Sequence, residues 1–449
     1  MSVLARWVQQ SCRQRQYPTR WQHLVTVVLL WGELQVSATP LQPRADAFIT
    51  LDSSALKVVH EVNERLLSFT LDSSYIMERW VDKHMRDEKF LKMASHLAPA
   101  YLRVGGTESD AMLFKESSSL EDRQNGEVAS RDFQTFYMTG DEWKLINEFV
   151  AKADLKLVFC INALHRSDGS PWDPSNAKQL LDSLAVVDVF TEPDLYSAMY
   201  HKYVTTSQLA EDFATLRSLL NSYPRYKSSL LIGPDVFSSD WYLGRFLTSE
   251  NNTLTETSSA YKGGATNITD RFVDGFMWLD KLGLAAKLGV DVVCRQNLYG
   301  NKYSLLNIDN FDPNPDWWLS VLYKKLVGTG ILNTTIPTGS VRLYAQCSKT
   351  SPGSIVLFGM NLNSQGADVQ VKSSATGVKA GKVLAYVLTG ESGLQSQTVL
   401  LNGKRLVMES NYSLPKLEPV TVSASPLHLP AFSLAFFVLE DIKVTACKW

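Results

Sequence analysis

The chain has 449 residues, of which 45% are hydrophobic and 20% charged, and its formal net charge is -2. This is the composition of a globular protein with enough apolar residues for a large core, and the length indicates two or three domains, or one barrel with an accessory domain. The balance of 44 basic and 46 acidic residues excludes a globally basic surface, so we expect no nucleic-acid partner.

The N-terminus has the features of a secretory signal peptide. Four arginines and no acidic residue precede Glu33, and an apolar run at 24–31 is followed by the small-residue sequence VSA at 36–38. The run is too short to span a bilayer. We predict a signal peptide over residues 1–38; the alternative is an uncleaved apolar segment.

Two further features fit secretion. Acceptor triplets for N-linked glycosylation begin at Asn251, Asn267, Asn333 and Asn411. Cys160 and Cys294 lie in apolar runs and are predicted to be buried thiols of strands. Cys347 and Cys447 both lie in the C-terminal region and could cross-link it.

From about residue 64 the sequence alternates between strand and helix patterns. Seven strand-like runs occur in the order RLLSFTLD, AYLRVGG, LKLVFCINAL, AVVDVFTEP, SLLIGPDV, NTLTET and DVVCRQ. Amphipathic stretches such as SQLAEDFATLRSLLNSY lie between them. Such alternation predicts an α/β fold with a parallel sheet, and this number of strands favours a (β/α) barrel over residues 46–330.

The pattern changes in the C-terminal region. Short alternating runs such as SVRLYAQC, GSIVLFGMNL and AFSLAFFVLE are separated by turns, and LNGK is a hairpin signal. We predict an all-β domain at residues 331–449, most simply a β-sandwich.

Two glutamates follow strand-like runs of the predicted barrel. Glu192 follows AVVDVFT, and Glu256 lies at the end of NTLTET. Chemistry in such barrels lies at the carboxyl ends of the strands, and two carboxylates are the minimal set for glycoside hydrolysis. The alternatives are a Glu-Pro strand terminator and a solvated carboxylate. No clustered His/Cys ligand set is present, so we expect neither a metal nor a cofactor.

Several long motifs resemble the heparanase family of retaining endo-β-glucuronidases, which cleave heparan sulfate. They appear in the family's order from about residue 46 to the C-terminus and include APAYLRVGGTESD, ETSSAYKGGA, GFMWLDKLG and NFDPNPDWWLSVLYKKLVGT. The resemblance implies a (β/α)₈ barrel followed by a C-terminal β-sandwich, in agreement with the pattern of predicted elements.

The resemblance also implies roles for individual residues. Glu192 matches the proton donor, and Glu256 matches the nucleophile. Substrate contacts are implied for Asp72, Thr107, Thr191, Tyr261, Lys262, Gly263, Gly300 and Tyr303. The family's sandwich disulfide corresponds to Cys347 and Cys447.

Two of these positions depart from the family pattern. Thr191 replaces an asparagine that binds the sugar hydroxyl next to the anomeric carbon, and its shorter side chain predicts some loss of rate. Lys262 replaces a glycine, so its side chain either crowds the sugar site or attracts a sulfate group.

The third departure is in length. In a barrel of about 250 residues, three βα units span about 94 residues, whereas only 64 separate Glu192 from Glu256. The family's strand 6, its following helix and the basic residues of that region have no counterpart. We therefore predict a barrel that lacks about one βα unit.

The sequence thus predicts a heparanase-like retaining endoglycosidase that acts on heparan sulfate or a related glycosaminoglycan. We expect it to be secreted into the extracellular matrix, to associate with the cell surface through proteoglycans, or to lie in lysosomes. The missing unit supports an alternative, a non-catalytic matrix or cell-surface binding protein. A third reading is an unstable variant retained in the secretory pathway.

Overall fold

The computed structural model describes residues 47–51, 56–117, 135–167, 170–183, 187–191, 196–229, 231–235, 254–260, 263–333, 339–373, 382–440 and 442–447. The predicted signal peptide lies outside these ranges. Residues from Asp46 to Trp449 form one compact unit.

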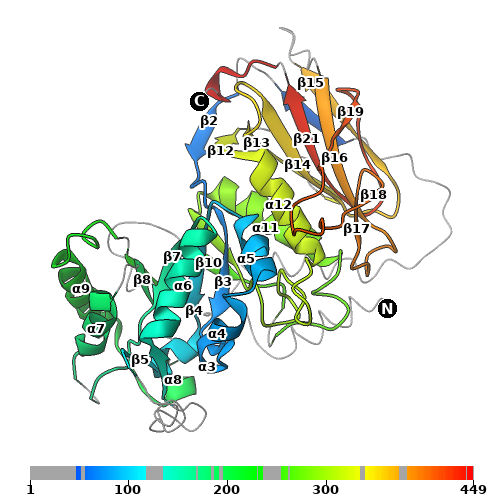
Figure 1. Cartoon of the computed structure of the whole chain (residues 1–449). Helices are drawn as coiled ribbons and strands as arrows, with labels where there is room; N and C mark the ends of the chain where they lie inside the picture. The colour runs from blue at the N-terminus through cyan, green and yellow to red at the C-terminus, as the bar shows by residue number, and fades with distance from the viewer. Residues whose placement is uncertain are drawn as a thin grey trace. The chain divides into compact units, whose positions relative to one another are not determined.

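A seven-stranded, all-parallel sheet forms the N-terminal part of this unit (Figure 1). In sheet order its strands are β10 (Leu254–Thr257), β11 (Val292–Arg295), β3 (Leu67–Asp72), β4 (Ala100–Gly105), β7 (Leu155–Cys160), β8 (Val187–Thr191) and β9 (Leu231–Asp235). Each strand corresponds to one of the strand-like runs of the sequence, so the predicted α/β fold is confirmed.

Helices follow most of these strands. They are α3 (Ser74–Met77), α4 (Trp80–His84), α5 (Glu88–Ser95), α6 (Gly140–Lys152), α7 (Ser175–Ser183), α8 (Tyr196–Tyr200), α9 (Thr206–Asn221), α11 (Asp274–Leu288) and α12 (Pro315–Leu326). A short 3₁₀ helix, η1 (Thr107–Ala111), and a two-stranded sheet of β5 (Met112–Lys115) and β6 (Phe136–Thr139) follow β4. Local sequence fixes several ends: Thr139 and Glu142 form a capping box at α6, and Gly289, with φ of 77°, ends α11.

The two end strands of the sheet, β9 and β10, lie close together. Residues of the two strands come within 8 Å of each other, measured between Cα atoms. Within the described ranges no hydrogen-bonded ladder joins them, and 236–253 between them are outside those ranges. The seven strands therefore form a ring with one seam, between β9 and β10, at which no ladder is described. This agrees with the predicted absence of one βα unit.

The inner face of this sheet carries a small apolar cluster of its own. Tyr101, Val158, Cys160, Val292 and Cys294 pack together there, apart from the larger core that the helices form with the outer face. Cys160 and Cys294 are fully buried thiols, as predicted.

A nine-stranded antiparallel sheet dominates the C-terminal part. It contains β18 (Lys404–Arg405), β17 (Val399–Leu401), β16 (Lys382–Gly390), β21 (Ser433–Glu440), β14 (Ile355–Asn361), β13 (Val341–Ser348), β12 (Val327–Leu332) and β2 (Val58–Glu61), with β19 (Val420–Val422) beside β16. A three-stranded sheet contains β1 (Ala47–Leu51), β15 (Ala367–Ser373) and β20 (Leu427–Leu429). The two sheets enclose their own apolar core, as expected for a sandwich.

The N-terminal strands belong to this sandwich and not to the barrel. β1 pairs with β15, and β2 pairs with β12. The sequence pattern predicts a barrel over residues 46–330, and these two strands depart from that boundary. Pairing gives the backbone groups of β12 and β15 partners that they would otherwise lack at a sheet edge.

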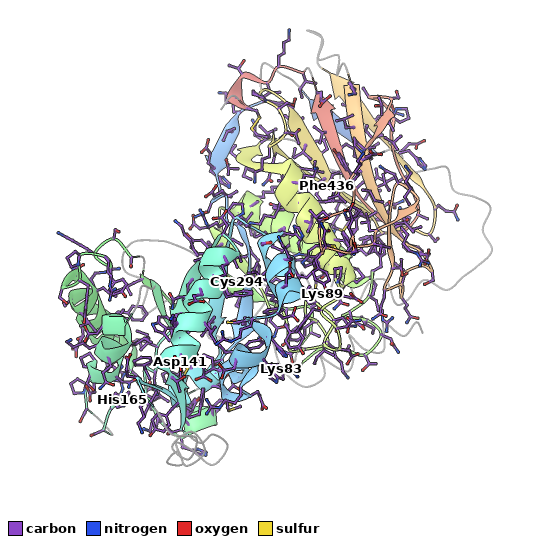
Figure 2. All side chains as sticks on the ribbon, in the orientation of Figure 1. Lys83, Lys89, Asp141, His165, Cys294 and Phe436 are labelled. Carbon is purple, nitrogen blue, oxygen red and sulfur yellow. A yellow bond between two sulfur atoms is a disulfide. The ribbon has the colours of Figure 1, made fainter. Side chains whose placement is uncertain are left out.

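The outer face of the sandwich packs against helices α11 and α12. Gly283 of α11 lies so close to the Tyr344 ring that a Cβ there would come within 2.2 Å of it. Asp280 accepts hydrogen bonds from Arg342 and from Tyr344, the latter at 2.7 Å. Phe436 of β21 is part of the same core as the barrel helices, whereas Cys294 lies inside the barrel (Figure 2). The sandwich thereby supports the helices that follow β10 and β11.

A disulfide joins Cys347 of β13 to Cys447 of the short 3₁₀ helix η2 (Thr445–Cys447), across a sequence separation of 100 residues. It links an early strand of the sandwich to the end of the chain. In the described part of the chain, no helix is both long and apolar enough to cross a membrane.

We expect the Cys347→Ala/Cys447→Ala double variant to lose about 4 kcal/mol of unfolding free energy, because the bond closes a loop of 100 residues. Thermal unfolding followed by circular dichroism measures this as a lower Tm. A reductant should lower the Tm of the wild type toward that of the variant and leave the variant's Tm unchanged. Equal Tm values for wild type and variant would contradict the expectation.

Candidate active site

A buried ion pair lies inside the barrel at the carboxyl end of β10. Nη1 of Arg103, on β4, donates to Oε2 of Glu256 at 2.6 Å. The Arg103 side chain is fully buried, and that of Glu256 is 16% exposed. A buried guanidinium stabilises the ionised form of a carboxylate, so Glu256 is held as an anion with access to solvent.

The sequence around Arg103 makes room for its side chain. Alternation along β4 directs Arg103 toward the barrel interior, whereas Leu102 and Val104 pack in the helix-covered core. Gly105 leaves the space that the guanidinium needs, since a Cβ there would lie 3.2 Å from Cζ of Arg103 and 2.1 Å from Sγ of Cys160. The YLRVGG sequence therefore places one arginine inside the barrel, with glycine two positions later to make room for it.

Asp72 and Tyr303 lie near this ion pair. Asp72 ends β3, and its carboxylate accepts a hydrogen bond from the Ser74 backbone at 2.9 Å. Gly106, with φ of 140°, lets the chain after β4 pass close to Asp72, because a Cβ there would lie 3.0 Å from Oδ2 of the carboxylate. Burial, and then the negative charges of Asp72 and Glu256, raise the pKa of Tyr303, so its hydroxyl stays protonated at neutral pH.

A cavity of about 260 Å³ opens beside these residues. It is lined by Asp72, Ser74, Tyr75, Trp80, Glu108, Asn297, Tyr299, Gly300, Asn301 and Tyr303. The lining comes from the segments that follow β3, β4 and β11, so the cavity lies at the carboxyl ends of the strands. This is the face on which barrel enzymes bind substrates.

The loops after β10 and β11 contact each other through glycine. Lys302 donates its backbone N–H to the Gly263 carbonyl at 2.9 Å. Gly264, with φ of 100°, lies against Tyr303, because a Cβ there would meet the Tyr303 nitrogen at 3.1 Å. Glycine at these positions permits the close approach of the two loops that carry Gly263 and Tyr303.

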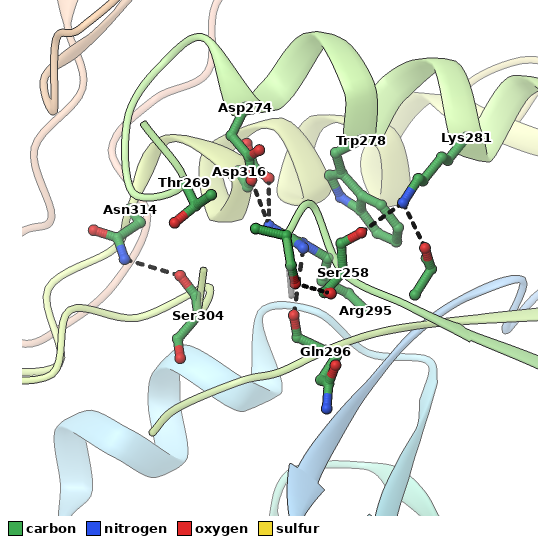
Figure 3. A network of polar contacts seen from close by, with 12 residues as sticks. Ser258, Thr269, Asp274, Trp278, Lys281, Arg295, Gln296, Ser304, Asn314 and Asp316 are labelled. Carbon is green, nitrogen blue, oxygen red and sulfur yellow. Dashed lines mark hydrogen bonds and ion pairs between the residues drawn. The ribbon is translucent and has the colours of Figure 1, made fainter. Parts of the chain in front are cut away.

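A second buried polar network links the end of β11 to helices α11 and α12 (Figure 3). Nη2 of Arg295, at the end of β11, donates to Asp274 at 2.7 Å and to Asp316 at 2.9 Å. Burial raises the pKa of both carboxyls, that of Asp316 well above its usual value, and the two carboxyls also interact with each other. The two carboxyls thus face one guanidinium, and the negative charge of Asp274 adds to the upward shift of the pKa of Asp316.

Lys281 connects this network to the segment that follows Glu256 (Figure 3). Its Nζ donates to Oγ1 of Thr257 at 2.5 Å and to the Ser258 carbonyl at 2.7 Å. Burial, and then the charge of Arg295, lower the pKa of Lys281 to about 8, while Asp274 and Asp316 oppose this shift. The amine therefore holds the Thr257 side chain and the Ser258 backbone, the two residues that follow Glu256.

The structure brings four of the predicted site residues together: Asp72, Glu256, Gly300 and Tyr303. Gly263 lies in the adjoining loop, and half-buried Thr107 begins η1 next to Glu108. Thr191 is the last residue of β8. Glu192, Tyr261 and Lys262 lie outside the described residues, so their placement stays a prediction.

Among the predicted glycosylation sites, Asn267, Asn333 and Asn411 are exposed, and Asn251 lies outside the described residues.

Sequence reasoning missed several residues of the site. Arg103, Arg295 and Asp316 are charged residues within the apolar runs AYLRVGG, DVVCRQ and NPDWW. Charged residues are almost never fully buried unless they are paired with an opposite charge. A charged residue within an apolar run therefore indicates a buried ion pair, and this signal could have identified the three residues. In the described ranges, no group of three or more His, Cys, Asp or Glu side chains is arranged to hold a metal ion.

Sequence comparisons agree with this geometry. The family model described as "Glycosyl hydrolase family 79, N-terminal domain" matches residues 72–257. Heparanase from Gallus gallus is 30% identical over 495 aligned positions, which cover 86% of this chain and 94% of the relative. Hyaluronoglucuronidase from Hirudo nipponia is 29% identical over 89% of this chain and 99% of its own length. Inactive heparanase-2 from Homo sapiens is 26% identical over 89% of this chain and 90% of its own length.

The alignment and the fold comparison also bear on the barrel. The 495 aligned positions exceed the 449 residues of this chain, so the Gallus gallus relative contains residues with no counterpart here. Among solved structures, a 4-O-α-L-rhamnosyl-β-D-glucuronidase from Fusarium oxysporum matches with a TM-score of 0.62 and 14% identity, over 87% of this chain and 100% of that one. The likeness supports the barrel and sandwich architecture.

The lowered pKa of Lys281 predicts a pH-dependent stability. Between the folded-state pKa of about 8 and the ordinary value of 10.5, the unfolded chain binds the proton and the folded chain does not, so stability rises with pH across this window. Relative to Lys281→Met, the wild type should gain about 2 kcal/mol of unfolding free energy between about pH 7 and pH 9.5. Urea unfolding at both pH values measures the difference.

Lys287 provides the matched control, because it is an exposed lysine on the same helix. The Lys287→Met variant should keep the pH dependence of the wild type. A constant difference between wild type and Lys281→Met at the two pH values would show that Lys281 has an ordinary pKa.

Proposed function

Because the chain belongs to the heparanase family of glycoside hydrolases, we propose that it is a retaining endo-β-glucuronidase acting on heparan sulfate or a related glycosaminoglycan. The observation that carries the proposal is Glu256, held ionised by Arg103 at 2.6 Å and open to solvent at the carboxyl end of a barrel strand. A retaining hydrolase needs such an anionic carboxylate to attack the anomeric carbon.

The reaction has two steps in this proposal. In the first, Glu256 attacks the anomeric carbon of a glucuronate residue, the glycosidic bond breaks, and Glu192 gives its proton to the leaving oxygen. In the second, Glu192 takes a proton from water, whose oxygen attacks the same carbon and releases Glu256. Retention requires about 5–5.5 Å between the two carboxyl groups.

The surrounding residues support these steps. Arg103 keeps Glu256 ionised, and Lys281 holds the Thr257 hydroxyl and the Ser258 carbonyl after it. The protonated Tyr303 hydroxyl, near Asp72 and Glu256, is suited to donate a hydrogen bond to a substrate oxygen. These contacts position the nucleophile before substrate arrives, which lowers the cost of reorganisation in the transition state.

Departures at two positions affect the expected rate. Thr191 ends β8 immediately before Glu192, where the family has asparagine. A threonine hydroxyl reaches less far, so we expect a weaker contact to the sugar hydroxyl beside the anomeric carbon. Lys262 in place of glycine adds a charge next to Gly263 in the sequence.

The proposal extends to organisation and location. Residues 46–330 would supply the catalytic barrel and 331–449 the sandwich, with β1 and β2 contributed to the sandwich from the N-terminus. Heparan sulfate is a component of extracellular matrix and of cell-surface proteoglycans, so secretion, cell-surface association or delivery to lysosomes would bring the enzyme to its substrate. The exposed acceptor asparagines at 267, 333 and 411 fit passage through the secretory pathway.

A second candidate function is glycan binding without turnover. The observations that favour it are the missing ladder between β9 and β10 in the described sheet and the similarity to the inactive human relative. This function predicts retention on a glycosaminoglycan column with no release of reducing ends. The two candidates differ in a single measurable quantity, the rate of bond cleavage.

We expect Glu256→Gln to lower kcat for release of reducing ends from heparan sulfate by about 10⁴-fold or more, because an amide cannot form the covalent intermediate. Glu192→Gln should also lower the rate, with the smallest effect on substrates whose leaving group needs no proton. Glu211→Gln, an exposed glutamate on α9, is the control and should retain full activity. Undiminished activity in Glu256→Gln would overturn the proposal.

Arg103→Met should lower kcat by about 10²–10³-fold and move the acidic limb of the pH–rate profile to higher pH, because Glu256 loses its counter-charge. Arg86→Met, at an exposed arginine, is the control. Circular dichroism and the Tm of both variants establish that they fold. A folded Arg103→Met variant with the wild-type profile would show that the ion pair has no part in catalysis.

A further inference from the structure

Three aromatic residues that line the cavity at the carboxyl ends of the strands contact one another. They are Tyr75, Trp80 and Tyr299, and we call them the aromatic wall. The centroid of the Trp80 ring lies 5.5 Å from that of Tyr75 and 5.5 Å from that of Tyr299, both in edge-to-face geometry. Tyr75 and Tyr299 are buried, and Trp80 is half-buried. The arrangement of the wall therefore depends on what packs behind it.

A histidine packs behind all three rings. His84, on α4, is buried with 5% of its surface exposed. The centroid of its ring lies 5.1 Å from that of Tyr299, 5.8 Å from that of Tyr75 and 5.9 Å from that of Trp80. One imidazole thus contacts every member of the aromatic wall from the side of the core.

A hydrogen bond joins this imidazole to the wall. Nδ1 of His84 lies 3.1 Å from the hydroxyl oxygen of Tyr75. Burial, and then interaction with Tyr299 and Asp87, raise the pKa of Tyr75 well above its ordinary value, so the hydroxyl keeps its proton. Among the described residues this hydroxyl has no second hydrogen-bond partner, and a buried hydroxyl proton requires an acceptor. Tyr75 therefore donates to Nδ1, and the proton of the neutral imidazole is on Nε2.

Protonation of His84 is incompatible with this hydrogen bond. An imidazolium carries an N–H group at both ring nitrogens, so Nδ1 would meet the Tyr75 hydroxyl as a second donor. The hydroxyl proton would then lose its acceptor in a buried position, which is costly. The contact between His84 and Tyr75 therefore exists in its present form only while the imidazole is neutral.

The charged groups around His84 do not favour the imidazolium. Burial, and then the charge of Lys83, lower the pKa of His84, whereas Asp87 opposes the shift. The charged groups on the neighbouring elements have partners of their own: Asp87 accepts from the Phe90 backbone at 2.9 Å, Lys89 donates to Asp312 at 2.5 Å, and Asp309 interacts with Tyr299. The neutral form is therefore the one present at neutral pH.

We propose that His84 is a positioning residue for the aromatic wall, whose rings keep their arrangement while the imidazole is neutral and lose it when the imidazole is protonated. The affinity of the cavity for a saccharide then falls as the pH falls through the range in which His84 titrates. This inference rests on the proposed function, because it takes the cavity to be the place where the saccharide binds.

Hydrogen exchange tests the wall without a ligand. Mass spectrometry follows the amides of residues 74–95, from α3 to α5, at about pH 5 and about pH 7, with rates corrected for the intrinsic pH dependence of exchange. In the wild type we expect corrected exchange to be at least about tenfold faster at the lower pH. Equal protection at the two pH values would overturn the proposal, and this comparison requires no variant.

His84→Asn tests the role of the proton. Its amide oxygen can accept from the Tyr75 hydroxyl, and the side chain cannot be protonated, so protection should be similar at both pH values. His201→Asn, at an exposed histidine, is the matched control and should behave as the wild type does. Circular dichroism establishes that both variants fold.

Calorimetry in the Glu256→Gln background measures the effect on binding. The probe is a hexasaccharide of alternating glucuronate and N-acetylglucosamine. It should bind about fivefold or more weakly at about pH 5 than at about pH 7, and His84→Asn should remove most of this change, whereas His201→Asn should not. A loss of affinity that is equal at both pH values in His84→Asn would show a purely structural role and contradict the proposal.

Turnover separates this proposal from the proposed function. Neither the exchange nor the binding measurement requires cleavage, so a wild type that releases no reducing ends would remove the hydrolase and leave the role of His84 intact. Cleavage with a pH–rate profile that His84→Asn does not alter would remove the positioning role and leave the hydrolase intact.

Discussion

The ion pair between Arg103 and Glu256 is the interaction on which the site depends. It crosses the barrel interior from β4 to β10 and joins two strands that are not neighbours in the sheet. A buried guanidinium is costly without a partner, and so is a buried carboxylate, so each stabilises the other where it stands. Small residues around the pair, above all Gly105 and Cys160, leave the room that it needs. Glu256, the proposed nucleophile, is therefore fixed by the core of the barrel and not by its loops.

The shortened barrel is compatible with this arrangement because its seam lies on one side of the site. β10 pairs with β11, and Glu256 lies opposite Cys294 in that ladder. The other side of β10 faces β9, which is near it but not joined by a described ladder. The helices that follow β10 and β11 are supported from outside by the sandwich, through contacts such as Gly283 with Tyr344. Support for Glu256 thus comes from β4, β11 and α11, none of which belongs to the missing region.

The sequence predicted the strands and part of the site, for identifiable reasons. Apolar runs bounded by turn residues marked all seven barrel strands, and the resemblance pointed to Glu256, Asp72 and Tyr303. It did not reveal Arg103, because pairing across a barrel is a tertiary contact between residues 153 apart. β1 and β2 were assigned to the barrel since chain order suggested it, whereas their partners lie more than 250 residues further on. The edge-to-face contacts of Trp80 with Tyr75 and Tyr299 were likewise not predictable, because Tyr299 comes from a distant segment of the chain.

The most direct test of the account is covalent labelling of the nucleophile. A 2-deoxy-2-fluoro glucuronoside with a good leaving group should form a slowly hydrolysed glycosyl-enzyme, because the fluorine slows both steps and the leaving group accelerates the first. Peptide mapping by mass spectrometry should locate the sugar on the peptide that carries Glu256, and Glu256→Gln should remain unlabelled. An adduct on another carboxylate, or turnover of substrate with Glu256 never modified, would contradict the assignment of Glu256 as the attacking group.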